Sequence, residues 1–154
     1  MSTLYETLIF VHVVAAAIIV GSGVLLFAMQ LRTLSTGDAA LAEERARNMA
    51  ATSKWAGPML ILPAAVVLIV VGVWAVENAD LDFSQAWLSI GATVWVIAAV
   101  VIGPLHAING KKLAAGLSAG WQTGRRVLVR ETVLTGVETA LLLFAVWAMV
   151  AKPG

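Results

Sequence analysis

Four long apolar runs dominate this sequence and leave few choices of fold. They extend from Leu8 to Met29, from Met59 to Val76, from Trp87 to Ile108 and from Thr132 to Val150. An α-helix rises about 1.5 Å per residue and needs about 17–25 residues to cross the hydrocarbon core of a bilayer. Each run has roughly this length. The sequence therefore predicts an all-α polytopic membrane protein, with four transmembrane helices in an antiparallel bundle.

The composition supports a membrane protein over a soluble one. Of the 154 residues, 60% are hydrophobic and 12% are charged, whereas soluble domains have about 45–50% apolar and about 25% charged residues. One small globule cannot bury that much apolar surface. We expect a single integral membrane domain over residues 1–154, with spans at about 8–31, 58–77, 86–109 and 129–150.

The placement of basic residues predicts the orientation of the chain. The connection between the second and third runs carries acidic residues and no basic one, whereas nine of the ten Lys and Arg residues lie in the other two connections: Arg32, Arg45, Arg47, Lys54, Lys111, Lys112, Arg125, Arg126 and Arg130. Basic connections stay in the cytoplasm. We therefore expect a multi-pass protein of the bacterial cytoplasmic membrane with both termini outside. Orientation and anionic lipid explain these cations, so nucleic acid is not expected as a partner.

The two basic connections differ in composition. The first contains an Ala-rich stretch with mixed charges, Asp38 to Thr52, which predicts a cytoplasmic helix between the first and second spans. The second reads N-G-K-K-L-A-A-G-L-S-A-G-W-Q-T-G-R-R, and its four glycines predict a flexible connection that could include one short surface helix. Pro63 and Pro104 are candidate kinks in the second and third spans.

Three ionisable residues, His12, His106 and Glu138, lie inside the apolar runs. A carboxylate at mid-bilayer costs about 2.5–3.5 kcal/mol on insertion scales, so it needs a partner or a task. Glu138 follows the interfacial Glu131 by seven residues, and His106 precedes Lys111 by five. Helical rise then gives Glu138 and His106 similar depths in the cytoplasmic half, whereas His12 belongs to the outer half.

A polar stripe on the fourth span predicts a proton or ion site. Glu131, Thr135 and Glu138 are spaced i, i+4 and i+7, so they share one face of a helix. Together with His106 as relay or counter-charge, they would form a route from the cytoplasm to mid-membrane. The alternative is a protonated, hydrogen-bonded Glu138 that fixes the packing of the third and fourth spans.

His12 is the first candidate ligand for a cofactor, with Met149 near its level. One b-type haem held between His12 and His106 is disfavoured, because the two should differ in depth by about 15 Å. A b-type haem would then need one histidine with another group or an open position, for which His12 and Met149 are the candidates. The alternative for His12 is an uncharged imidazole hydrogen-bonded between helices. The chain has no cysteine and no cluster rich in Met or His, so no metal is identified.

The segments L-I-F-V-H-V-V-A-A-A-I-I-V-G-S-G and V-I-G-P-L-H-A-I-N-G-K-K-L resemble a bacterial family of four-span membrane proteins classed as a domain of unknown function. The chain is similar in layout to the copper-resistance D proteins and to the HemJ-type protoporphyrinogen oxidases. The HemJ likeness implies a b-type haem used with a histidine early in a span and a lysine in a later one. His12 matches that histidine, followed by Gly21 and Gly23, but no lysine lies inside a span. The likeness to the copper-resistance D proteins implies copper uptake.

Three classes of function follow. The leading hypothesis is a small redox- or haem-associated membrane subunit, and the second is a small proton- or cation-coupled carrier or channel that uses Glu138 and His106. The third is a structural or assembly subunit, so a second copy or another membrane protein is an expected partner besides lipid. No catalytic residue is assigned, because the sequence has neither a Gly-rich phosphate loop nor a nucleophile elbow.

Overall fold

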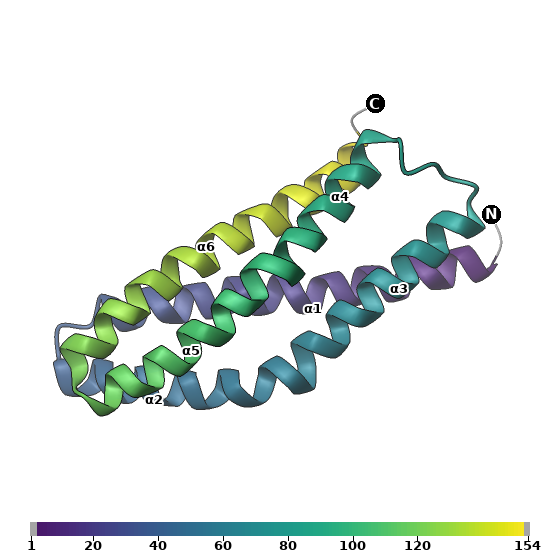
Figure 1. Ribbon diagram of the computed structural model, residues 1–154. Helices are drawn as coiled ribbons and strands as arrows, with labels where there is room; N and C mark the ends of the chain where they lie inside the picture. The colour runs from purple at the N-terminus through teal and green to yellow at the C-terminus, as the bar shows by residue number, and fades with distance from the viewer. Residues whose placement is uncertain (1–2, 153–154) are drawn as a thin grey trace.

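The computed structural model describes residues 3–152, and within that range the chain forms helices and no strand (Figure 1). The all-α prediction is confirmed. In chain order the elements are α1 (Thr3–Leu34), α2 (Ala39–Ala56), the π-helical segment η1 (Gly57–Ile61), α3 (Leu62–Asn78), α4 (Ala86–Ile97), the π-helical segment η2 (Ala98–Ile102), α5 (Gly103–Ser118) and α6 (Trp121–Ala151).

These elements join into four continuous helical rods that are long and apolar enough to cross a membrane, which confirms the four predicted spans. The rods are Thr3–Leu34, Ala39–Asn78, Ala86–Ser118 and Trp121–Ala151. Large apolar side chains cover their outer surfaces, among them Phe10, Val100 and Val150. In a bilayer such side chains face acyl chains, while the backbone polar groups are bonded inside the helices.

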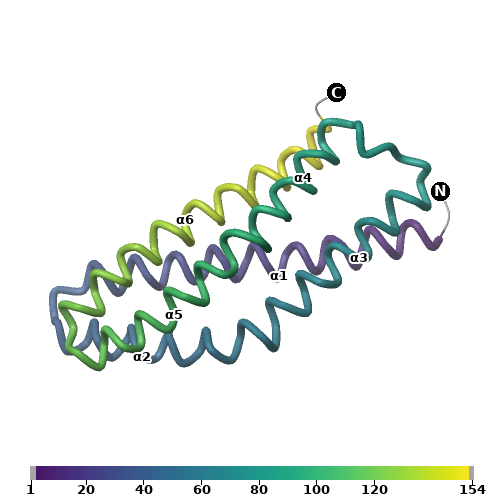
Figure 2. The backbone as a smooth tube through the Cα atoms, viewed as in Figure 1, coloured from purple at the N-terminus to yellow at the C-terminus, as the bar shows by residue number. Residues whose placement is uncertain are grey.

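The bundle is built around α1 and α6, which pack against each other (Figure 2). α3 packs on α1, and the rod formed by α4, η2 and α5 packs on α6. The start of α1, the end of α6 and the α3–α4 connection lie at one end, which we call the terminal end. The α1–α2 and α5–α6 connections lie at the other, which we call the basic end because most Lys and Arg residues lie towards it.

The two ends differ in how closely the helices pack. At the basic end α2 contacts α1, α5 and α6. A buried apolar core joins α2, α5 and α6 there: Ala46, Met49, Leu113, Leu117 and Leu128. Towards the terminal end α3 and α4 diverge, and the connecting residues 79–85 cross between them (Figure 1). The bundle is therefore closed at the basic end and spread at the terminal end.

A helix between the first and second spans is present as predicted, and Asp38 begins it. The Asp38 carboxylate accepts hydrogen bonds from the backbone N–H groups of Ala40, at 2.9 Å, and Leu41, at 3.3 Å. Such an N-cap satisfies donors that the first turn leaves without partners. The Arg47 guanidinium, at 2.7 Å from the Leu117 carbonyl oxygen, then ties α2 to α5.

Each π-helical segment ends shortly before a proline. In η1 and η2 the wide turn closes on the carbonyl groups of Gly57 and Ala98, five residues back along the chain. Pro63 and Pro104 follow, and a proline inside a helix lacks an N–H donor and crowds the carbonyl four residues earlier. A wider turn relieves this crowding. The turn in η2 lies directly before the part of α5 that carries His106.

The prediction of a flexible second connection is wrong. α5 continues to Ser118 and α6 begins at Trp121, so only two residues separate the helices. The glycines serve packing instead, because a Cβ atom at Gly116 would lie 3.1 Å from the Cα atom of Gly124. Glycine lets helix backbones approach this closely. Gly120, with φ of 114°, makes the turn itself.

Candidate functional site

A polar cluster lies between α5 and α6, inside the membrane-crossing rods. His106 on α5 contacts a carboxylate with each ring nitrogen: Nδ1 bonds to Oε1 of Glu131, and Nε2 lies 2.8 Å from Oε2 of Glu138. The two glutamates are seven residues apart on α6, so two helical turns bring them to one face. One imidazole spans the gap between them.

Asn109 completes what we call the carboxylate–histidine cluster: His106, Asn109, Glu131 and Glu138. The Asn109 amide donates a hydrogen bond of 2.8 Å to Oε2 of Glu131, so both oxygens of that carboxylate have partners. The Glu131 side chain is 11% exposed, whereas the side chains of His106 and Glu138 are each 23% exposed. Within the cluster, the Glu131 side chain is thus more deeply buried than the Glu138 side chain.

The hydrogen bonds of the cluster allow a proton to change places. An ionised carboxylate only accepts hydrogen bonds, so two ionised glutamates require both nitrogens of His106 to carry protons. With a neutral imidazole, one glutamate must hold the proton and donate it to the ring. Both arrangements contain the same number of protons and keep the same heavy-atom contacts. A proton can therefore pass from Glu131 to Glu138 through the ring.

Thr135 lies between the two glutamates in sequence, but the structure does not bring it into this cluster. Its hydroxyl donates to the Glu131 backbone carbonyl at 2.9 Å and accepts from the Gln30 amide of α1 at 3.2 Å. Its exposure is 1%. The predicted polar stripe is in fact two networks, one facing α5 and one facing α1, and the imidazole links the two carboxylates.

The sequence analysis missed Gln30, although an amide within the predicted span 8–31 is a recognisable signal. Gln30 is 1% exposed, and among the described residues neither its Oε1 atom nor the Thr139 Oγ1 atom has a hydrogen-bond partner. Thr139 faces α1 at Gly23, where a Cβ atom would lie 3.0 Å from Oγ1. The α1–α6 interface therefore carries two buried oxygens free to accept hydrogen bonds.

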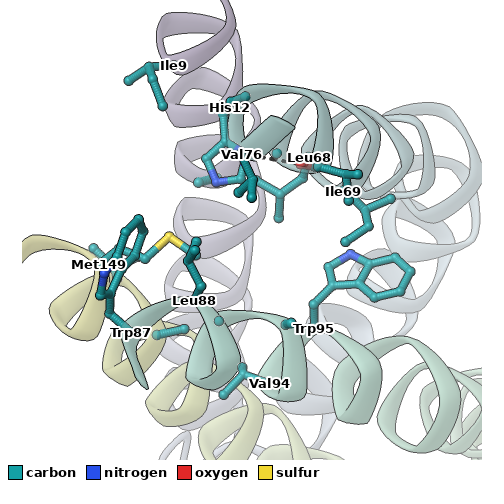
Figure 3. A pocket seen from close by; sticks show the side chains of 18 of the residues that line it. Ile9, His12, Leu68, Ile69, Val76, Trp87, Leu88, Val94, Trp95 and Met149 are labelled. Atoms are coloured by element: carbon teal, nitrogen blue, oxygen red, sulfur yellow. Dashed lines mark hydrogen bonds between the residues drawn. The ribbon is translucent and has the colours of Figure 1, made fainter. Parts of the chain in front are cut away.

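A second region of interest is a cavity of about 170 Å³ between α1, α3, α4 and α6, towards the terminal end (Figure 3). Its walls are almost entirely apolar, and Leu81 and Phe83 of the α3–α4 connection contribute to them. His12 of α1 and Met149 of α6 both line it, so the structure brings these two predicted residues to one place.

The His12 ring is held in place by α3. Its Nδ1 atom lies 3.0 Å from the backbone carbonyl oxygen of Leu68, and a Cβ atom at Gly72 would lie 2.9 Å from its Cε1 atom. A carbonyl oxygen only accepts, so Nδ1 must be the donor. The neutral ring then has its lone pair on Nε2.

The cavity does not fit a haem in this arrangement of the helices. A cavity of about 150 Å³ holds one benzene, and the four-pyrrole macrocycle of a haem is several times larger than benzene. His106 cannot supply a second axial ligand here, because both of its ring nitrogens are bonded to carboxylates. Within residues 3–152, no group of three or more His, Cys, Asp or Glu side chains is arranged to hold a metal ion.

Four apolar helical rods, with a carboxylate–histidine cluster between two of them, define a polytopic helical membrane protein. The chain belongs to the family described as "Predicted integral membrane protein (DUF2269)", which matches residues 6–153. This confirms the resemblance to a membrane family of unknown function. No curated protein and no solved structure matches the chain. The likeness to copper-resistance D and HemJ-type proteins stays a prediction.

Proposed function

We propose that this single membrane domain is a small proton-coupled carrier, in which Glu131, His106 and Glu138 pass a proton along the α5–α6 interface. One observation supports this above all: a single imidazole is bonded to two carboxylates within the spans. Ionisable groups inside membrane helices mark proton relays and ion pathways, because burying them without a task is costly.

The order of the groups gives the relay a direction along the membrane normal. Glu131 lies nearer the basic end, and Glu138 is seven residues, about 10 Å of helix, further in. The carboxylate that ends the relay, Glu138, is also the more exposed of the two. A proton taken up at the Glu131 end would therefore be held at mid-membrane.

The region beyond Glu138 favours a carrier over an open channel. Leu142, one helical turn later, already forms part of the apolar cavity wall. Apolar side chains give a proton no hydrogen-bonded path, so transfer past Glu138 requires a change in helix packing. A change of this kind between two states is how carriers couple a proton to transport.

Proton flux into liposomes tests the relay. Purified protein would be reconstituted around a pH-sensitive dye, and a membrane potential would drive proton uptake. Glu138→Gln keeps the volume and the hydrogen-bonding oxygen but cannot carry a proton, so we expect flux to fall by at least about tenfold. Glu77→Gln, an exposed position at the terminal end, is the matched control and should keep wild-type flux. Equal flux in Glu138→Gln and wild type would refute the relay and leave packing as the role of the cluster.

We also infer that the basic end faces the cytoplasm of a bacterial cell, since basic connections are retained there. The chain contains no cysteine, so single cysteines report on orientation without background. Ser84 and Ser118 are exposed and lie at opposite ends. In intact cells a membrane-impermeant maleimide should label Ser84→Cys and leave Ser118→Cys unlabelled. The reverse pattern would contradict the orientation.

A further inference from the structure

We propose that the cavity at the terminal end binds a lipid-soluble phenol or alcohol whose hydroxyl group donates a hydrogen bond to Nε2 of His12. The site lies apart from the carboxylate–histidine cluster, and the proposal does not depend on proton transfer there. It rests on the size and lining of the cavity, on the fixed orientation of the His12 ring, and on access from the membrane.

The cavity fits a small apolar body. Its volume of about 170 Å³ is close to that of an apolar cavity known to accept one benzene, about 150 Å³. Trp87 and Trp95 contribute indole rings to the wall, and aliphatic side chains supply most of the rest (Figure 3). Aromatic rings pack well against other aromatic rings. A ligand with one aromatic ring, or a branched aliphatic body of that size, matches this space.

His12 gives the cavity a hydrogen-bond acceptor of defined orientation, while Tyr5, Trp87 and Trp95 also bring polar groups to its lining. The Nδ1–Cε1 edge of its ring lies against Leu68 and Gly72 of α3, which leaves the edge with Nε2 for the cavity. Because Nδ1 donates to the Leu68 carbonyl, Nε2 of the neutral ring is an acceptor. A ligand hydroxyl group can donate a hydrogen bond to Nε2. An ether or ketone oxygen has no proton to donate, so it would only bring its own lone pairs towards that of Nε2. At His12 the geometry therefore favours ligands that can donate a hydrogen bond.

Access to the cavity is from the lipid. The helices around it turn apolar side chains outward along their length, and α3 and α4 diverge where it lies (Figure 1). One wall is also adaptable: a Cβ atom at Gly91 would lie 2.3 Å from the terminal methyl of Met149, the flexible end of that side chain. Methionine side chains adjust readily to different shapes. The occupant is accordingly a molecule that partitions into the bilayer.

Paired ligands test the proposal on the wild-type protein in lipid nanodiscs. 4-Ethylphenol can donate a hydrogen bond, and 4-ethylanisole, of similar shape, cannot. With ¹³C-labelled methionine methyl groups, Met149 reports on the cavity, and Met149→Leu assigns its signal. We expect a saturable shift with 4-ethylphenol and about 3- to 10-fold weaker binding of 4-ethylanisole, the range that one net hydrogen bond supplies.

His12→Phe is the matched variant, because it keeps an aromatic ring and removes the acceptor. It should bind both ligands with equal affinity. Equal affinities in the wild-type protein would overturn the proposal, and so would a shift that rises without saturation, the result expected if acyl chains fill the cavity. The comparison of two ligands on one protein keeps the test decisive even if the variant does not fold.

Discussion

The two histidines of this chain occupy opposite halves of the bundle and meet opposite partners. His106, near the closed end, is bonded to a carboxylate at each nitrogen, whereas His12, beside the cavity, is bonded to one backbone carbonyl. Carboxylates can exchange a proton with the ring, and a carbonyl oxygen can only accept one hydrogen bond from it. We therefore propose different roles for the two imidazoles, a proton conduit for His106 and a fixed hydrogen-bond acceptor for His12.

The helices pack more closely in the basic half than in the terminal half. In the basic half, α2 covers the bundle and Gly116 meets Gly124 at backbone contact distance. In the terminal half the helices spread around a cavity with the flexible Met149 in its wall. A relay needs fixed distances between its groups, and a binding site for varied apolar molecules needs room to adjust. Each half has the packing that its proposed task requires.

The largest predicted effect is on the closed half. His106→Ala leaves two carboxylates without the group between them, and we expect the free energy of unfolding to fall by about 3 kcal/mol, as when one partner of a buried ion pair is removed. His12→Ala loses one hydrogen bond to a carbonyl, so its free energy of unfolding should be only about 1 kcal/mol lower than that of the wild type. Reversible unfolding in mixed detergent micelles measures both.

Coupling within the cluster supplies the control for that experiment. Glu131→Gln and Glu138→Gln, added to His106→Ala, remove the unpaired charges and should recover a large part of the lost stability. Residues in one network are expected to be non-additive in this way. If the three substitutions destabilise additively, the cluster is not a coupled unit and the contrast between the two histidines fails.

A smaller effect is expected from filling the close crossing at the basic end. A Cβ atom at Gly124 would lie 2.5 Å from Cδ2 of Leu117 and 3.2 Å from its backbone nitrogen. The backbone atom can move only if α5 and α6 separate, so Gly124→Ala should lower the free energy of unfolding by about 1–3 kcal/mol. Gly110→Ala, with nothing within 4 Å, is the matched control and should not destabilise.

The smallest effect is expected at Gly91, in the open half. A Cβ atom there would lie 2.3 Å from the Met149 methyl, which is nominally a worse clash than at Gly124. Because Met149 is flexible and borders the cavity, it can move aside, and Gly91→Ala should change the free energy of unfolding by less than about 0.5 kcal/mol. A loss as large as that of Gly124→Ala would show that the terminal half is packed as tightly as the basic half.

The spans and the similar depth of His106 and Glu138 in the membrane could be predicted from the sequence, because both follow from local rules. Hydropathy locates the helices, and a fixed rise per residue places His106 and Glu138 at one level. The structure joins these two residues at 2.8 Å. Neither prediction depends on which helices pack against each other.

Features that depend on neighbouring helices could not be predicted. A spacing of i, i+4 and i+7 still spreads Thr135 and Glu138 over about 60° of the helix surface, and with α1 on one side and α5 on the other this separates their networks. The glycines of the second connection indicated flexibility, but their close contact appears only when α5 and α6 are packed. The cavity arises in the same way, from helices that diverge after the closed end.

The most direct test of the relay uses the fact that the chain has only two histidines. Solid-state NMR of protein in bilayers, with ¹⁵N-labelled histidine and ¹³C-labelled glutamate side chains, resolves both rings at once. We predict that both ring nitrogens of one histidine, assigned to His106, couple through space to glutamate carboxyl carbons, and that Glu138→Gln removes the coupling at Nε2. A His106 ring that shows no coupling to any glutamate carboxyl carbon would contradict the relay.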